Sequence, residues 1–192
     1  MPGKSTALKK PESGVALLIT GLPAAGKTSL GRALTSRIEK DFGRQVSLLD
    51  GDEVRKLLSS ELGFSREHRR LNVLRHGYIA AEVCRHGGVA VCALIAPYAA
   101  DRAEMRRLVT RHGSFIEIYL STPLQVCEQR DPKGLYARAR AGALQHMTGI
   151  DDPYESPLKP GLKLDGSKLS VEKLVGAVTE HLERKKLLQK SR

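Results

Sequence analysis

The residues best suited to chemistry stand in a glycine-rich run near the start of the chain. The run reads Gly-Leu-Pro-Ala-Ala-Gly-Lys-Thr from Gly21 to Thr28, after the apolar stretch 15–19 and before a helical stretch. Glycines let the backbone curl so that successive N–H groups converge on phosphate oxygens, and the following helix adds the positive end of its dipole. In such a loop Lys27 reaches the β- and γ-phosphates and the Thr28 hydroxyl binds Mg²⁺. The run predicts a site for ATP and Mg²⁺; the alternative is a chance glycine turn.

Two carboxylates follow the next apolar run. Asp50 and Asp52 flank a glycine directly after residues 46–49. In a parallel α/β sheet ligands bind at the carboxyl ends of the strands, so both side chains should face the phosphate-binding loop. The third apolar run ends in Ala96-Pro97 and supplies no Asp for the metal. Asp50 and Asp52 are therefore the candidates for supporting Mg²⁺ and orienting an acceptor hydroxyl; the alternative is a helix cap plus a turn, with Asp52 as the cap.

Positive charge gathers in a later, irregular part of the chain. Residues 130–160 are polar and rich in Gly, Pro and Arg, with one short helical piece at 135–141. A long irregular segment inside a compact domain is usually a functional lid. Arg130, Lys133, Arg138 and Arg140 would strengthen their phosphate contacts when closure expels water. The alternative is a solvated basic helix.

Short β-branched runs that alternate with helical stretches must position these residues. The expected strands are 15–19, 46–49, 89–95, 115–120 and a short one near 162–164, and the expected helices are 27–40, 66–86, 100–111 and one from about 170. This alternation predicts an α/β fold with a parallel sheet and helices on both faces. Residues 1–13 have the composition of a disordered lead or linker. Residues 14–192 are expected to form one domain, with a lid at about 130–160.

The helical stretch 66–86 has two distinct faces at 100° per residue. The face expected to pack on the core carries Leu71, Leu74, Tyr78 and Ala81, and the opposite face carries Arg69, Asn72 and His76. That polar face points either to a site or to solvent. Phe64, just before the helix, is either a core residue or a platform on which a base stacks.

Composition excludes several classes of protein. The net charge is +11 in 192 residues, which fits either a nucleic-acid surface or an enzyme for anionic substrates. Aromatic residues make up only 4% and Trp is absent, so no base-stacking platform for single strands and no nucleic-acid partner is expected. No run is long enough to span a membrane and no secretory leader is apparent. The three cysteines are an odd number in apolar or helical segments, which is typical of reduced thiols in the cytoplasm.

Six segments together resemble one family, the adenylyl-sulfate kinases. They run in the family's order over about residues 15–165 and read GLPAAGKT, LLDGDEVR, LGFSREHRRLN, RHGGVAVCALIAPYAADR, FIEIYLSTPLQVCEQRDPKGLYARARAG and TGIDDPYESP. DPKGLY and GIDDPYE have no generic structural explanation, so the resemblance is specific. The short segments IAPY and LN look most like those of kinase domains fused to sulfate adenylyltransferase in some bacteria.

The resemblance implies a P-loop, nucleoside-monophosphate-kinase-like fold that phosphorylates the 3′-hydroxyl of adenylyl sulfate with Mg²⁺ and ATP. By resemblance, ATP is held by Gly21, Leu22, Pro23, Ala24, Ala25, Gly26, Lys27, Thr28 and Arg130. The matching contacts to adenylyl sulfate are Asp52, Arg55, Phe64, Arg69, Asn72, Ile95, Ala96, Lys133, Met147 and Thr148. The candidate catalytic groups are Asp52, Lys27 and Asp50, and the candidate metal ligands are Thr28 and Asp50. A homodimer and a sulfate adenylyltransferase, fused or functionally coupled, are the candidate partners.

Three departures from the family pattern bear on the chemistry. The family's Ile-Ser-Pro is Ile95-Ala96-Pro97 here, and that Ser is assigned as a phosphoserine intermediate in some members, so direct transfer is implied. Met147 stands where the family usually has a Phe that clamps the adenine. The family's Asp-Arg pair is His68-Arg69, and a Glu common before the Asn is replaced by Leu71. Met147 leaves open a related kinase for another nucleotide 3′-hydroxyl, and a P-loop regulatory module is the alternative from another class.

Overall fold

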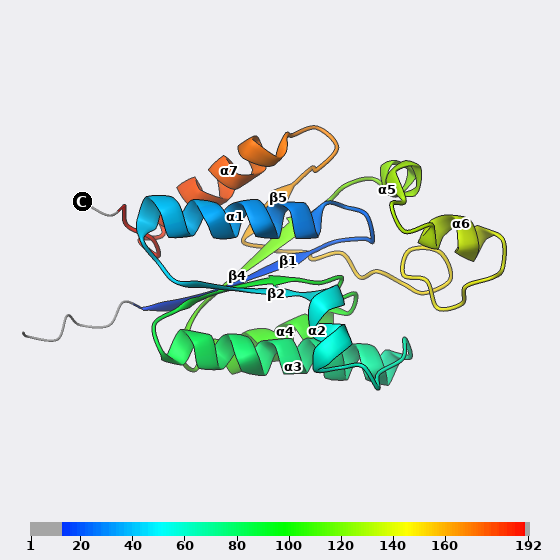
Figure 1. Cartoon of the computed structure of the whole chain (residues 1–192), viewed down its shortest axis with the longest axis horizontal. Coiled ribbons are helices and arrows are strands. Elements are labelled where there is room, and N and C mark those ends of the chain that lie inside the picture. The colour runs from blue at the N-terminus through cyan, green and yellow to red at the C-terminus, as the bar shows by residue number, and fades with distance from the viewer. Residues whose placement is uncertain (1–12, 191–192) are drawn as a thin grey trace, which may run out of the picture.

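The computed structural model describes residues 13–190, and it places five parallel strands in one sheet between two layers of helices. Helices α1 and α7 cover one face of the sheet, and α3 and α4 cover the other (Figure 1). The strands are β1 (Gly14–Thr20), β2 (Val46–Asp50), β3 (Val89–Ala93), β4 (Gly113–Leu120) and β5 (Leu162–Leu164). The helices are α1 (Lys27–Phe42), α2 (Gly51–Leu57), α3 (Arg66–Arg85), α4 (Ala99–Val109), α5 (Leu124–Arg130), α6 (Leu135–Arg140) and α7 (Val171–Arg184). The predicted α/β class is confirmed.

The strand order β2-β3-β1-β4-β5 puts β1 at the centre of the sheet. All seven residues of β1 are buried, which explains its unbroken apolar run, because helices cover both faces of a central parallel strand. The loop that follows β1 therefore opens at the middle of the carboxyl edge, between the ends of β3 and β4. This is the edge at which parallel α/β sheets bind their ligands.

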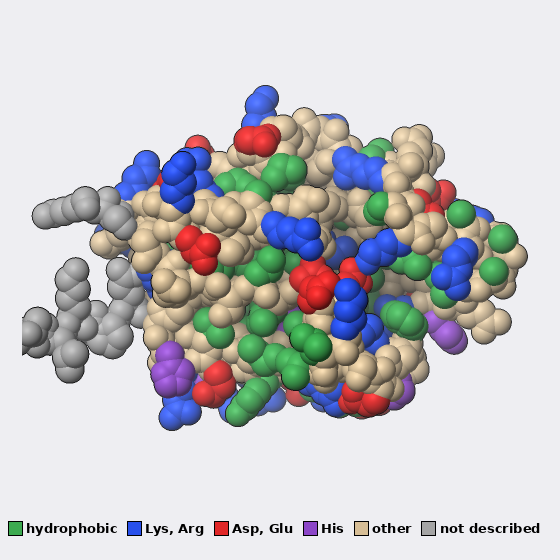
Figure 2. All heavy atoms as spheres, in the orientation of Figure 1, with side chains coloured by type: hydrophobic (Ala, Val, Ile, Leu, Met, Phe, Trp, Pro, Cys, Tyr) green, Lys and Arg blue, Asp and Glu red, His purple; other side chains and the backbone are tan. Residues whose placement is uncertain are grey.

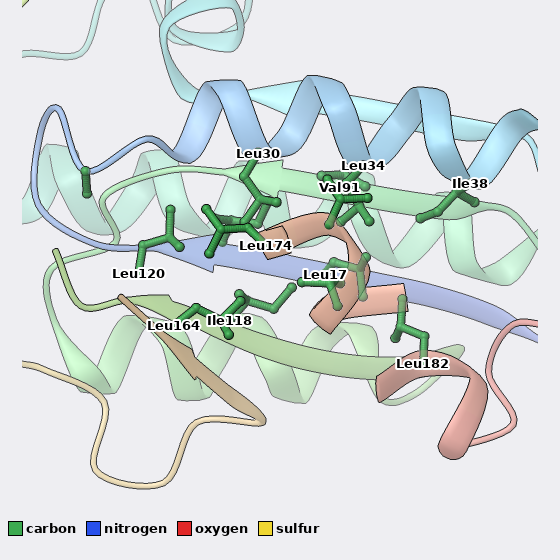
Figure 3. Packing of buried hydrophobic residues seen from close by; sticks show 14 of the residues in the cluster. Leu17, Leu30, Leu34, Ile38, Val91, Ile118, Leu120, Leu164, Leu174 and Leu182 are labelled. Carbon is green, nitrogen blue, oxygen red and sulfur yellow. The ribbon is translucent and has the colours of Figure 1, made fainter. Parts of the chain in front are cut away.

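Leucine and isoleucine side chains fill the layer between the sheet and the helices α1 and α7. Figure 3 shows Leu30 and Leu34 of α1 above Leu17 of β1, and Ile118 of β4 and Leu182 of α7 pack in the same cluster. Each of these side chains is fully buried. Burial of one such side chain stabilises the fold by about 1.5–3 kcal/mol. This layer holds α1, and with it the loop at its start, rigidly against the sheet.

The core-facing side of α3 differs from the prediction. Tyr78 is 64% exposed, whereas Asn72 and His76 are buried. The reason is that α3 and α4 pack closely at Gly77. A Cβ added to Gly77 would lie 3.1 Å from Met105 Cγ, so there is no room for a large side chain at this contact. The face of α3 that packs inward thus consists largely of small and polar residues. The positions of the large apolar residues therefore did not predict which face packs inward. Ala81 is buried as expected.

Several element limits also differ from the sequence predictions. β3 ends at Ala93, two residues short of Ile95. Helices α2 and α5 were not predicted, and Asp50 rather than Asp52 caps α2, accepting a hydrogen bond from the Asp52 N–H. The expected strand at residues 162–164 is present as β5.

The lead expected at residues 1–13 lies, apart from Ser13, outside the described residues. Within residues 13–190 no helix is both long enough and apolar enough to cross a bilayer.

The three cysteines are free, buried thiols, and burial raises the pKa of Cys84 to about 11. The expected lid contains α6 and a series of turns, and its limits and movement remain predictions.

Candidate active site

The phosphate-binding loop joins β1 to α1. Gly26 caps α1 in the left-handed conformation (φ 104°), which an L side chain rarely adopts. Ala24 is left-handed as well (φ 58°), and alternation of this kind turns successive N–H groups toward one point. The N-terminus of the 16-residue helix α1 lies directly behind that point. The loop can therefore hold an anion before any side chain contributes.

Thr28 and Asp50 meet beside the loop. The Thr28 hydroxyl donates to Asp50 Oδ2 over 2.7 Å, and Asp50 Oδ1 accepts the Asp52 N–H over 3.0 Å. Asp50 is 6% exposed, so these bonds fix its carboxylate at the end of β2. The structure thus brings together the two residues that the sequence predicted as metal ligands. Hydroxyl and carboxylate oxygens are the protein ligands that Mg²⁺ prefers.

Lys27 folds back over the loop. Its Nζ donates to the Leu22 carbonyl over 2.7 Å. Burial lowers the pKa of Lys27 to about 8, while the negative charges of Asp52 and Asp50 act in the opposite direction. The ammonium therefore lies within the field of both carboxylates. It has an exchangeable partner that a phosphate oxygen could replace.

Three side chains from α5, α6 and the segment before α5 brace the loop from outside. The Tyr136 hydroxyl donates to the Pro23 carbonyl over 3.0 Å, and the Thr122 hydroxyl donates to the Ala25 carbonyl over 3.0 Å. Arg130 donates to the Gly166 carbonyl, and its Nη1 would lie 3.9 Å from a Cβ at Gly26. Arg130 thus lies beside the phosphate-binding loop, and its contact with ATP stays a prediction. Tyr136 and Thr122 were not predicted, because they share no motif with the loop.

Asp52 and Lys133 form an ion pair across the site. Asp52 stands in the first turn of α2, and Lys133 comes from the short segment between α5 and α6. Both side chains are more than half exposed, so the pair is accessible to a ligand and contributes little to stability. Figure 2 shows acidic side chains beside several Lys and Arg near α2, in the middle of this face of the molecule.

Two arginines flank the ring of Phe64. The guanidinium carbons of Arg55 and Arg69 lie 4.8 Å and 5.5 Å from the ring centroid. Arg55 donates to the Leu62 carbonyl, and Arg69 donates to the Phe64 carbonyl. Phe64 is 51% exposed, so this aromatic ring remains accessible beside two cations. Three residues predicted from the sequence to bind one anionic nucleotide are therefore close together.

Some buried polar atoms near this site have no partner among the described residues. Asn72 Oδ1 and Thr148 Oγ1 are two of them, and His76 Nε2 is a third. Leaving such an atom unpaired costs about 1–3 kcal/mol, so it often marks where a ligand or water binds. Asn72 and Thr148 were predicted to contact a nucleotide, whereas His76 was not. Burial lowers the pKa of His76, which keeps the ring neutral.

Met147 belongs to the core as well as to the expected base site. It is 5% exposed and packs within the layer that holds α1. Its backbone N–H donates to Asp151 Oδ1 over 2.6 Å, so the carboxylate fixes the turn before Thr148. A base clamped between Phe64 and Met147 remains a prediction.

The loop after β3 carries the last two predicted residues. Ile95 is half-buried, and Ala96 is buried with a left-handed backbone (φ 43°). Their carbonyls bond to side chains that the sequence reasoning did not identify, those of Thr20 and Arg102. The family segments RHGGVAVCALIAPYAADR and TGIDDPYESP were the sequence signals that pointed toward this region.

The parallel sheet carries the phosphate-binding loop after its central strand, and the Thr28 hydroxyl meets the Asp50 carboxylate at the end of β2. This arrangement defines a P-loop kinase fold. A family model described as adenylylsulphate kinase matches residues 13–165. The chain belongs to the adenylylsulphate kinase family.

Individual relatives agree with this assignment. An adenylyl-sulfate kinase of Synechococcus sp. is 45% identical over 169 residues, which span 88% of this chain and 94% of the relative. A solved structure of an APS kinase from Mycobacterium tuberculosis, in complex with AMPPNP and APS, is 38% identical with a TM-score of 0.86 and covers 90% of this chain and 99% of its own. A sulfate adenylyltransferase of Neurospora crassa is 41% identical over 179 residues, 93% of this chain, but the match spans only 31% of that longer protein.

Proposed function

We propose that this chain transfers the γ-phosphoryl group of ATP to the 3′-hydroxyl of adenylyl sulfate, giving 3′-phosphoadenylyl sulfate and ADP. The bond between the 3′-oxygen and the γ-phosphorus forms while the bond from that phosphorus to the β,γ-bridging oxygen breaks. The main support is the position of Asp52. Its N–H bonds to the carboxylate of Asp50, which in turn accepts the hydroxyl of Thr28, so Asp52 lies next to the candidate metal ligands. An acceptor hydroxyl held by Asp52 would be close to a phosphate held by the loop.

Lys27, Thr28 and Asp50 serve the ATP side in this proposal. Within the described residues no group of three or more His, Cys, Asp or Glu side chains could hold a metal. Thr28 and Asp50 would therefore hold Mg²⁺ together with phosphate oxygens and water, as is usual for this ion. Bound Mg²⁺ offsets the charge of the β- and γ-phosphates. Lys27 would leave the Leu22 carbonyl for a phosphate oxygen.

The acceptor side would bind the phosphosulfate and the adenine separately. Arg55, Arg69 and Lys133 are the cations for the phosphosulfate group. Phe64 offers its exposed ring to the adenine, with Met147 on the other side of the base. The unpaired oxygens of Asn72 and Thr148 are acceptors for donors on the nucleotide.

Asp52 would orient the 3′-hydroxyl and accept its hydrogen bond, and the proton would leave through this carboxylate. Lys133 pairs with that carboxylate, and in this proposal the pair opens when adenylyl sulfate binds. We also propose that closure of the lid, about residues 130–160, brings Arg130 and Lys133 onto the phosphates. Ala96 has no hydroxyl, so the transfer is direct and passes through no phosphoenzyme at this position.

The setting of the reaction belongs to the same proposal. Three free, buried thiols suit the cytoplasm, where disulfides are rare. The match to part of a sulfate adenylyltransferase supports a fused or functional partner that makes adenylyl sulfate. A homodimer is the oligomer that we propose, and light scattering on the purified chain would measure it.

A coupled assay of ADP release tests the substrate assignment. The chain is given Mg·ATP with adenylyl sulfate, AMP, other nucleoside monophosphates and nucleosides in turn, with EDTA as the control. We expect kcat/KM for adenylyl sulfate to exceed that for every other acceptor. A preference for another nucleotide would make the chain a related kinase of a different acceptor, and no turnover with any of them would favour a regulatory module.

A further inference from the structure

Three successive carbonyls of the loop after β3 are each held by another part of the molecule. The Ile95 carbonyl accepts from the Thr20 hydroxyl over 2.5 Å, and the Ala96 carbonyl accepts from Arg102 Nη1 over 2.8 Å. The Pro97 carbonyl accepts from the Glu155 N–H over 2.8 Å. The loop lies at the carboxyl edge of the sheet and includes two predicted substrate contacts. Its backbone is therefore fixed residue by residue.

The left-handed Ala96 explains why so many bonds are needed. A non-glycine residue at φ 43° is held in a sparsely populated conformation, which persists only where its surroundings enforce it. Ala96 is buried, and the Arg102 bond to its carbonyl is charge-assisted. Without these bonds the loop would relax toward the commoner backbone conformations and displace Ile95.

Arg102 is itself fixed by two more partners. Its side chain is 4% exposed, its Nε donates to Glu117 Oε1 over 2.8 Å, and its Nη2 donates to the Glu155 carbonyl over 2.7 Å. One guanidinium thus joins β4, the loop after β3 and the segment 154–156. The Glu155 carboxylate adds a bond to the Ala99 N–H, at the start of α4.

A hydroxyl relay makes a second connection. The Thr20 hydroxyl has one proton, which it donates to the Ile95 carbonyl, so it must accept from the Tyr154 hydroxyl 2.9 Å away. Burial raises the pKa of Tyr154, so this donor stays protonated. Thr20 is the last residue of β1, directly before the phosphate-binding loop. The relay therefore runs from the segment 154–156 through the central strand to the loop after β3.

The same segment also reaches the base side of the site. Arg69 of α3 bonds to the His146 carbonyl and lies 3.5 Å from Asp152. Residues 146–156 are thus tied to α3 at one end and to the loop after β3 at the other, with Met147 and Thr148 between them. We propose that Thr20, Arg102, Tyr154 and Glu155 are positioning residues, which hold the Ile95–Pro97 loop at a fixed spacing from Met147 and Thr148. This rests on the proposed function, because that spacing is the width available to the acceptor nucleotide.

Two conservative variants and one matched control test the proposal. Thr20→Val removes the relay hydroxyl and Tyr154→Phe removes its donor, while each keeps the shape of the side chain. Tyr119→Phe is the control: the Tyr119 ring stacks on Tyr154 with centroids 5.9 Å apart, and its hydroxyl bonds to Ser156 of the same segment over 3.0 Å. No bond of the Tyr119 hydroxyl among the described contacts reaches the loop after β3.

We expect KM for adenylyl sulfate to rise about tenfold in Thr20→Val, because the Ile95 carbonyl loses its partner, and by a smaller factor in Tyr154→Phe. KM for ATP should stay within about twofold, and Tyr119→Phe should match wild type in both constants. A merely structural role would lower the melting temperature and change both constants alike. That outcome, or an unchanged KM for adenylyl sulfate in a folded Thr20→Val variant, would overturn the proposal.

Amide hydrogen exchange provides a readout that needs no activity. Peptides covering residues 94–102 should exchange faster in Thr20→Val and Tyr154→Phe than in wild type and Tyr119→Phe. If wild type turns over adenylyl sulfate but neither exchange nor KM changes, the positioning proposal fails and the function stands. If wild type does not use adenylyl sulfate, the function fails, and the exchange rates alone decide whether these residues fix the loop.

Discussion

The two halves of the candidate active site are built in different ways. The phosphate half is one run of eight residues, Gly21–Thr28, with Asp50 beside it. The acceptor half draws on α2, α3, the loop after β3 and the segment 146–156, which are joined by bonds between residues as many as 134 positions apart. A contiguous loop carries its own geometry, whereas the acceptor half depends on cross-links. We therefore expect changes in the first half to affect the chemical step, and changes in the second to affect which nucleotide binds.

The largest effect is expected from Lys27→Ala in the phosphate half. Loss of the ammonium should lower kcat by about 10²–10³-fold, the scale for removing one donor to a charge that develops in the transition state. The melting temperature should change little, because Lys27 bonds to the Leu22 carbonyl and not to the hydrophobic core. Lys40→Ala, in the last turn of the same helix, is the control. Near-normal turnover with an unchanged melting curve would refute the phosphate-binding assignment.

Phe64→Ala should produce the largest effect of a single side chain in the acceptor half. Loss of base stacking should weaken adenylyl sulfate binding by about 1–3 kcal/mol and leave KM for ATP unchanged. The ring is half exposed, so the fold should tolerate the change. Tyr78→Ala removes another exposed aromatic residue, from α3, and serves as the control. Equal losses for both substrates would contradict a division of the site into two halves.

The pH dependence of ATP binding should report on the phosphate half alone. A bound triphosphate adds negative charge beside Lys27 and so raises its pKa above the value of about 8 that burial gives it. A group whose pKa rises on binding contributes fully below its free pKa, and its contribution is lost as the pH rises toward the bound pKa. Affinity for a non-hydrolysable ATP analogue should therefore be level below about pH 8 and fall by up to about tenfold per pH unit above it.

Calorimetric titration at several pH values would measure this profile. Lys27→Arg, whose guanidinium stays charged throughout, should bind more weakly and show no such fall. A level profile for wild type across the same range would mean that Lys27 does not titrate at the phosphate site.

The smallest effect is expected from Met147→Phe. Restoring an aromatic residue should tighten adenylyl sulfate binding by at most about 1 kcal/mol, the scale of an aromatic pair beyond its buried area. Met147 is packed in the core, so the rigid ring should also lower stability by about 1–3 kcal/mol. The ratio of kcat/KM for adenylyl sulfate to that for other nucleotides measures the first effect, and a melting curve measures the second. An unchanged ratio in both Met147→Phe and Phe64→Ala would mean that the base binds elsewhere.

The phosphate half could be predicted from the sequence because its geometry is local. The residues from Gly21 to Thr28 determine a loop, and the rule for parallel strands predicts that Asp50 lies beside it, where it forms the 2.7 Å contact with Thr28. The fold could be predicted for a similar reason, because each buried strand is a short run with its own pattern.

The acceptor half could be predicted only in part. Resemblance supplied Arg55, Phe64 and Arg69, but no pattern of spacing links Tyr154 to Thr20 or Arg102 to Glu155. The face of α3 was predicted wrongly because Gly77, and not a large apolar residue, marks its contact with α4. β3 was predicted two residues too long, since the left-handed turn at Ala96 follows from its bonds and not from its residue type.

The fate of the γ-phosphoryl group tests the central claim most directly. The chain is incubated with γ-labelled ATP, Mg²⁺ and adenylyl sulfate and quenched in acid, and the nucleotide and protein fractions are counted. We expect the label in the nucleotide fraction, from which a 3′-nucleotidase should release it as phosphate. We expect no label on the protein, because Ala96 offers no hydroxyl. Stoichiometric label on any protein residue that chases into product would contradict direct transfer, and label at any position other than the 3′-oxygen of adenylyl sulfate would contradict the proposed reaction.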